Sequence, residues 1–161
     1  LELDESRMFF DTNHLEGYVR STASFGLCAP DSSIVAAISL RRPLFNRYPG
    51  WLELGRACCR IDANVRGWLG KLSTVARNFA REQGSAGVMT YVDARVGSGG
   101  AYASAGWVLV DADTGPRFWW TDFCNRFNRA MFNMKNQERV AADAGFVPIY
   151  GCSNSRWELT A

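Results

Sequence analysis

The chain has 161 residues, of which 47% are hydrophobic and 21% are charged. This composition excludes global disorder, and the length favours one domain over residues 1–161 with a sizeable core. The net charge of +2 is too small to indicate a nucleic-acid partner by itself. No apolar run reaches the length of a membrane span and the first residues do not resemble a signal peptide, so no membrane partner is expected.

The cysteines show no Cys-x-x-Cys pair, which disfavours a zinc ribbon. Their number is odd, which favours reduced thiols and a cytoplasmic location. The five cysteines are Cys28, Cys58, Cys59, Cys124 and Cys152.

The chain begins with a predicted helix over residues 4–13, with Met8 and Phe9 on its apolar side. His14, the only histidine, follows in a loop rich in hydrogen-bonding groups. A histidine in such a place can transfer a proton or bind a metal, and a structural role is the alternative.

Two strands over residues 24–28 and 34–40 are joined by turn residues, which predicts a hairpin. Residues 51–60 predict a third strand, in which Gly55 indicates a bulge or a close backbone approach. Cys58 and Cys59 point to opposite faces of that strand, so no bond between them is expected.

A helix is predicted from about Leu69 to Gln83, after a glycine-bearing turn. Such a turn exposes backbone N–H groups and a positive helix end, which suit a phosphate or pyrophosphate. Tight packing at Gly67 and Gly70 is the alternative. The predicted cofactor-binding residues are Arg66, Gly67, Trp68, Leu69, Gly70 and Lys71.

The stretch of residues 88–107 predicts an α/β unit. An apolar strand ends at Asp93, and a glycine loop leads into a short helix that carries Tyr102. Ligands of such sheets bind beyond the carboxyl ends of the strands. Asp93 and Tyr102 are therefore candidates for proton exchange with a substrate. The alternatives are a carboxylate that caps a turn and a tyrosine packed as core.

The remainder predicts a strand over residues 118–121, a helix over 137–144 and a closing hairpin of 146–150 with 156–159. The order of elements up to residue 110 resembles that of the GNAT acetyltransferases. The resemblance implies an α/β, GNAT-like fold, with a central mixed sheet flanked by helices.

Two local motifs accompany that order. Tyr102-x-x-x-Gly106-Trp107 resembles the GNAT pattern Tyr-x-x-x-Gly-aromatic, whose tyrosine often protonates a leaving thiolate. The turn before Leu69 lies where the family binds the pyrophosphate of coenzyme A, although Asn64-x-x-Gly67-x-Leu69 departs from the usual Arg/Gln-x-x-Gly-x-Gly/Ala. The resemblance implies a small-molecule donor of the acyl-coenzyme A type.

A second resemblance covers nearly the whole chain. The chain resembles the GNAT-like domain of phage Mom-type DNA-modification proteins, and the accessory domain of some phage homing endonucleases. Six motifs occur in the same order: Asn13-His14-Leu15-Glu16-Gly17, the strand 24–27, Leu52-Glu53-Leu54-x-Arg56, Tyr91-x-Asp93-x-Arg95, Tyr102-x-x-x-Gly106-Trp107 and Tyr150-x-Cys152-x-Asn154-x-x-Trp157-Glu158.

This resemblance implies an enzyme that carbamoylmethylates the exocyclic amine of adenine in DNA, which protects phage DNA from restriction. It implies active-site positions at His14, Asp93 and Tyr102, with Ser98 and Arg56 as further candidates. An iron requirement proposed for the family would make His14 and Asp93 metal ligands. If the protein is phage-encoded, its location is the cytoplasm of the host cell.

Double-stranded DNA is the expected partner, since basic residues among aromatic ones suit a groove that follows a DNA backbone. Two alternatives remain: a non-catalytic DNA-binding module, and an acetyl-coenzyme A-dependent N-acetyltransferase acting on a small amine. The predicted DNA contacts are Arg41, Arg42, Arg56, Arg126 and Arg129.

Overall fold

The computed structural model describes residues 1–44, 48–115, 118–132 and 137–161, without the side chains of Arg126, Asn128, Arg129 and Ala130. The helices are α1 (Leu3–Asn13), α2 (Trp68–Glu82), α3 (Gly100–Ser104) and α4 (Gln137–Asp143), and a 3-10 helix covers Arg129–Phe132. The strands are β1 (Ala23–Cys28), β2 (Ile34–Arg41), β3 (Trp51–Cys59), β4 (Gly87–Asp93), β5 (Val108–Asp111), β6 (Phe118–Thr121), β7 (Arg126–Asn128), β8 (Val147–Tyr150) and β9 (Asn154–Thr160).

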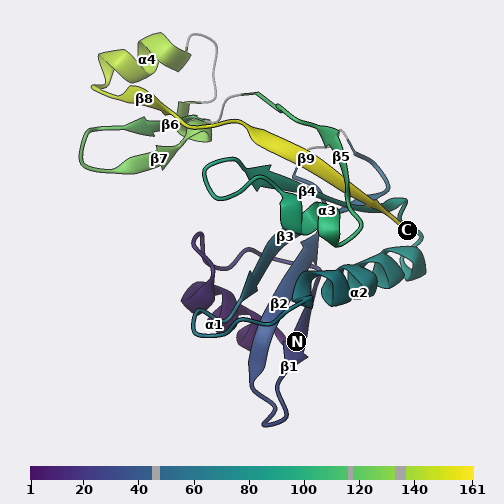
Figure 1. Cartoon of the computed structure of the whole chain (residues 1–161). Coiled ribbons are helices and arrows are strands. Elements are labelled where there is room, and N and C mark those ends of the chain that lie inside the picture. Colours follow the sequence, from purple (N-terminus) through teal and green to yellow (C-terminus); the bar gives the residue numbers. More distant parts are fainter. Residues whose placement is uncertain (45–47, 116–117, 133–136) are drawn as a thin grey trace.

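The strands form two sheets. The larger has the order β1-β2-β3-β4-β9-β5, in which β3 and β4 are parallel and the other neighbours are antiparallel. This confirms the predicted central mixed sheet. The smaller sheet has the order β7-β6-β8. Figure 1 shows this small sheet and α4 standing away from α1 and α2, with β9 leading from their side into the main sheet.

Helices cover both faces of the main sheet, because alternate residues of its strands are apolar on both sides. Ile38 and Leu40 of β2 pack with Leu72 of α2 in the main core, on what we call the α2 face. Ala37 points the other way and packs with Phe9 and Phe10, on what we call the α1 face.

The expected apolar side of the first helix was partly wrong. Phe9 is buried as predicted, but Met8 is 70% exposed and Phe10 is fully buried. At about 100° per residue, Met8 and Phe10 lie on opposite sides of the helix, so only one of them can face the sheet.

The bulge predicted at Gly55 is confirmed. The β2–β3 register passes from Ser39 opposite Arg56 to Leu40 opposite Leu54, so Gly55 is the extra residue. All five cysteines are free thiols, Cys58 and Cys59 included.

The closing hairpin was wrong. β8 pairs with β6 in the small sheet, whereas β9 enters the main sheet between β4 and β5. The physical reason is burial, since Trp157 and Leu159 of β9 join the main core on the α2 face. Among the described residues, no helix combines the length and apolar character needed to cross a membrane.

Candidate active site

The two parallel strands of the main sheet diverge, and we call the opening between them the fork. β3 and β4 pair only from Trp51 opposite Gly87 to Glu53 opposite Met89, although both strands continue for several residues. The Thr90 hydroxyl bridges the start of the opening by donating to the Leu54 carbonyl over 3.2 Å. Beyond this point the facing edges of the two strands are not paired with each other.

Tyr102 lies at the fork on the α2 face. Its ring packs edge-on against Trp107, with centroids 5.4 Å apart, and lies 6.4 Å from the ring of Trp157. Burial raises the pKa of the Tyr102 phenol, and an interaction with the Thr90 side chain opposes the rise. A raised pKa keeps the phenol protonated at neutral pH, which is the form that can donate a proton.

Tyr102 also borders a hollow of about 350 Å³, which we call the Tyr102 hollow. The glycine loop and the start of α3 form most of its wall, so the predicted α/β unit does create a concave surface. Its lining residues are Val92, Val96, Gly97, Ser98, Gly99, Gly100, Ala101 and Tyr102.

Two other predicted catalytic residues, Asp93 and His14, lie on the α1 face. Asp93 is three residues beyond Thr90 on β4, and an odd spacing in a strand places it on the opposite face. Asp93 and Tyr102 therefore approach the fork from two sides of the sheet. The sequence prediction that both residues exchange protons with one substrate did not take this alternation of faces into account.

His14 caps the carboxyl end of α1 and lies beside Arg56 of β3. The His14 Nδ1 accepts a hydrogen bond from the Glu16 N–H over 3.1 Å. The Arg56 guanidinium donates to the Gly17 carbonyl over 2.7 Å and pairs with the Glu16 carboxylate over 3.5 Å. Arg56 thus ties the His14 loop to the sheet.

The electrostatic surroundings of His14 favour a neutral imidazole. Partial burial and the positive charge of Arg56 lower the pKa of His14, and the negative charge of Glu16 opposes them. Glu16 also acts on Arg95, whose pKa is raised chiefly by its hydrogen bond with Asp93. The structure therefore brings the His14 loop and the Asp93–Arg95 pair into one charged cluster.

We expect the His14 imidazole to titrate below 6.5 in the folded protein. Between the folded pKa and 6.5 the unfolded chain binds more protons, so His14 lowers the stability as the pH falls through 6.5. As the only histidine, His14 gives one set of imidazole proton signals, which NMR can follow against pH. Arg56→Gln should raise that pKa, whereas Arg60→Gln, at a residue paired with Asp62, should leave it unchanged. Equal titrations in all three proteins would contradict this account.

Asp93 is engaged by its neighbour in the loop. The Arg95 Nε lies 3.0 and 3.1 Å from the two Asp93 oxygens, and the Arg95 backbone N–H donates to Oδ1 over 2.9 Å. The Arg95 guanidinium also lies 4.8 Å from the centroid of the Trp119 ring. The turn-capping alternative is thus realised, and a substrate amine would have to displace Arg95 to reach the carboxylate.

The predicted metal ligands do not fit a metal ion. The Nδ1 of His14 accepts from a backbone N–H, and both Asp93 oxygens are bound by Arg95. Within the described ranges, no group of three or more His, Cys, Asp or Glu side chains is arranged to hold a metal. No catalytic step is therefore assigned to iron.

The start of α2 fits the predicted phosphate-binding turn. Gly67 is the N-cap with a φ of 71°, a conformation that favours glycine, and no side chain caps the helix. A Cβ added at Gly67 or Gly70 would meet no heavy atom within 4 Å, so the tight-packing alternative is wrong. Arg66 and Lys71 are exposed on either side, while Leu69 is 7% exposed and faces the core.

The predicted DNA-contacting arginines have different surroundings. Arg41 forms an ion pair with the buried Glu53, and its side chain is 16% exposed, as is that of Arg56. Both guanidinium groups are turned towards protein partners, whereas Arg42 is exposed. The side chains of Arg126 and Arg129 lie outside the described part of the chain. DNA binding by these residues stays a prediction.

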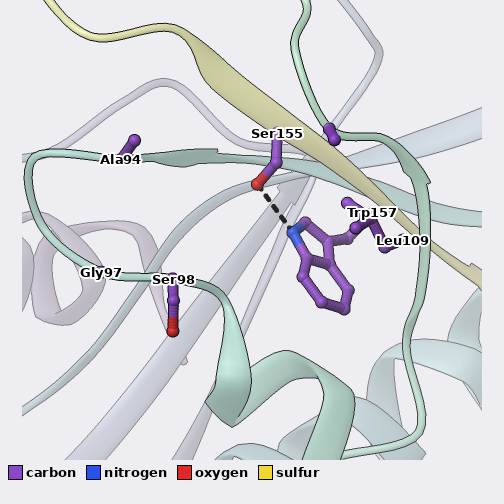
Figure 2. A pocket seen from close by; sticks show the side chains of 7 residues that line it. Ala94, Gly97, Ser98, Leu109, Ser155 and Trp157 are labelled. Carbon is purple, nitrogen blue, oxygen red and sulfur yellow. Dashed lines mark hydrogen bonds between the residues drawn. The ribbon is translucent and has the colours of Figure 1, made fainter.

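Ser98 lines the Tyr102 hollow and a second hollow of about 200 Å³, which we call the Trp157 pocket. Figure 2 shows Ser98 and Trp157 across this pocket, with Ser155 above the indole. Sequence reasoning missed Trp157 and Ser155 as site residues, although both lie within the Tyr150 to Glu158 motif. Ala94, Gly97, Leu109 and Ala112 complete the described lining.

Solved structures share the fold of this chain. A Bacillus subtilis acetyltransferase in complex with CoA matches at a TM-score of 0.57 and 12% identity, over 100% of this chain and 94% of that one. The ribosomal-protein-S18-alanine N-acetyltransferase of Escherichia coli matches at 0.52 and 13%, over 99% and 90%. A Bacillus anthracis protein solved with acetyl coenzyme A matches at 0.53 and 12%, over 89% of this chain but only 64% of that one.

These neighbours define the class of the fold. The chain has the GNAT acetyltransferase fold, as the order of its elements predicted. No protein-family model matches the chain, and no curated protein sequence matches it. At 12–13% identity these three neighbours establish the fold alone, and their descriptions do not mention DNA.

Proposed function

We propose that this chain is a transferase that moves an acyl-type group from a coenzyme A-type donor to an amine. The observation that carries the proposal is the fork, with a protonated tyrosine on one face and a neutral histidine on the other. Two of the fold neighbours are described in complex with CoA or acetyl coenzyme A, which supports the choice of donor.

The residues present fit such a donor. The uncapped start of α2 offers N–H groups and a positive helix end for its phosphates, with Arg66 and Lys71 beside them. Beyond Glu53 and Met89, where β3 and β4 no longer pair with each other, an extended chain can enter between the two strands. When bound, the donor supplies an acyl group activated as a thioester.

The side chains divide the proton transfers between the two faces of the sheet. His14 is neutral at pH 7, and its proton-free nitrogen is the Nδ1 that accepts the Glu16 N–H. The proton that the attacking amine loses is taken up at this Nδ1, once the exposed hydrogen bond from Glu16 opens. Tyr102 donates its phenolic proton to the sulfur of the leaving thiolate. The amine nitrogen gains a bond to the acyl carbon as the carbon–sulfur bond breaks, so protons and electrons balance without a further reactant.

A finer proposal concerns the acceptor, which we place in DNA. The six-motif resemblance supports the exocyclic amine of adenine, with resistance to restriction as the benefit. The carbamoylmethyl group that the resemblance implies is joined to nitrogen through a methylene carbon, so acyl transfer from a thioester does not form it and gives an N-acyl amine instead. Since that amine is inaccessible to chemistry within paired DNA, the base would have to leave the stack. The internal partners of Arg41 and Arg56 count against DNA contacts by these two residues, both for the DNA-modifying enzyme and for the rival reading, a non-catalytic DNA-binding module.

Two measurements test the broad and the fine proposal separately. Purified protein should be stabilised against heat by coenzyme A, and it should release free thiol from acetyl-coenzyme A when a suitable amine is present. DNA from cells that express the protein should yield a new adenine-derived nucleoside by mass spectrometry. If coenzyme A neither stabilises the protein nor yields free thiol, the transferase proposal is wrong. If thiol is released but the DNA nucleosides are unaltered, only the proposal of DNA as the acceptor is wrong.

A further inference from the structure

The Trp157 pocket lies at the carboxyl end of β4, next to the proposed active site. It begins at Ala94, the residue after Asp93, and shares Gly97 and Ser98 with the Tyr102 hollow. At about 200 Å³ it exceeds the cavity of about 150 Å³ that accommodates benzene in an engineered protein core. A single planar ring system therefore fits beside the fork.

The indole of Trp157 is held rigidly at this pocket. Its Nε1 donates to the Ser155 hydroxyl over 2.9 Å, a bond that Figure 2 shows. On another side the ring lies so close to Gly99 that an added Cβ there would stand 2.4 Å from its Cζ2. Trp157 is 6% exposed, so it presents only a small part of its ring to the pocket, as a fixed wall. A fixed wall contacts a flat ring at little cost in conformational entropy.

The polar groups of the pocket are neutral. The Ser155 oxygen accepts from the indole and still has its own proton to donate, and the Ser98 hydroxyl offers a donor and an acceptor. None of the described lining residues is charged, and Ala94, Leu109 and Ala112 add apolar surface. This chemistry suits a neutral ring with a hydrogen-bond acceptor on its edge, and it offers no counter-charge to a cationic amine.

We propose that the Trp157 pocket holds the neutral, planar heteroaromatic ring that carries the amine of the acceptor. Ser155 donates to a ring nitrogen, the exposed part of Trp157 contacts the ring as a fixed wall, and Ser98 lies on the side that leads to Tyr102. The inference rests on the proposed transferase function, because it names the class of acceptor for that site. Specificity for a flat heterocycle over a flexible amine is its consequence.

The test measures binding without turnover, so it is independent of whether transfer occurs. Adenosine is the neutral-ring probe and spermidine the flexible cationic one, each titrated by ligand-observed NMR. Adenosine should bind the wild-type protein and spermidine should not. Ala112→Phe fills the pocket and should lower the affinity for adenosine at least tenfold. Val108→Phe should leave this affinity unchanged, because Val108 is an exposed residue of β5 outside the pocket.

Variants of Ser155 and the affinity for coenzyme A provide the remaining measurements. Ser155→Ala should lower the affinity for adenosine about 3- to 10-fold, because it removes one hydrogen bond, and Ser155→Thr should retain the wild-type affinity. If the Ala112→Phe protein does not fold, Leu109→Trp is a second variant that fills the same pocket from another of its lining residues. Adenosine binding that survives both filling variants would overturn the proposal. A matching loss of coenzyme A affinity in them would also overturn it, because the pocket would then serve the adenine of the donor.

Discussion

Replacing Tyr102 by phenylalanine is expected to slow turnover by about 10²- to 10⁴-fold, the usual range for removing a general acid. The fold should survive, because the ring keeps its contacts with Trp107 and Trp157. The Thr90 hydroxyl donates to the Leu54 carbonyl in any case, so the change leaves no donor without a partner. Donor affinity should be nearly unchanged.

The pH profile gives this expectation a second readout. Because the phenol acts in its protonated form and its pKa is raised, wild-type activity should persist well above neutral pH and fall only as that raised pKa is approached. The residual activity of Tyr102→Phe should lack this alkaline fall. Turnover equal to wild type in the folded variant would return Tyr102 to the purely structural role that its packing already allows.

The second large effect is expected at Gly99, where alanine should lower the free energy of unfolding by about 2–4 kcal/mol. Gly99 has a φ of 81°, and its added Cβ would overlap the rigid indole of Trp157. Gly97→Ala is the matched control, since it lies two residues away with open space around its Cβ and no positive φ. Its effect should stay within about 0.5 kcal/mol.

Urea unfolding of the two variants measures both values. Equal stability losses at Gly97 and Gly99 would show that the loop as a whole is sensitive, and would contradict the specific contact with Trp157. An unaltered Gly99→Ala protein would mean that the indole moves freely. That result would also remove the rigid surface on which the pocket proposal depends.

Local periodicity predicted most of the elements of the main sheet. The apolar strand that ends at Asp93, the helix after Gly67 and the bulge at Gly55 depend on neighbouring residues and on backbone conformation, and they can be recognised without knowing the partners. The order of these elements was enough to predict the GNAT fold.

Pairing between distant strands could not be predicted in the same way. The alternation in β9 is compatible with a hairpin to β8 and with insertion into the main sheet, because the sequence pattern of a strand does not depend on which strand it pairs with. Only the burial of Trp157 and Leu159 in the main core decides between them. The roles of Trp157 and Ser155 as pocket walls were missed for the same reason.

The candidate site shows a related limit. His14, Asp93 and Tyr102 were singled out as candidate site residues, and their catalytic roles stay predictions. The folded chain places His14 and Asp93 on the α1 face and Tyr102 on the α2 face, and the sequence does not show which partners hold them. The ion pairs of Arg41 with Glu53 and of Asp93 with Arg95 depend on side-chain geometry. Charge counting treats such arginines as available for DNA, whereas the folded chain gives them internal carboxylates.

The place of β9 also bears on how the chain reaches its native state. β5 is synthesised well before β9, yet its described partner in the main sheet is β9. The sheet therefore cannot close until β9 has left the ribosome, and Val108, Leu109 and Val110 of β5 stay exposed even in the folded chain. Such late, long-range pairing raises the contact order, slows folding and leaves an unpaired apolar edge open to self-association in the meantime.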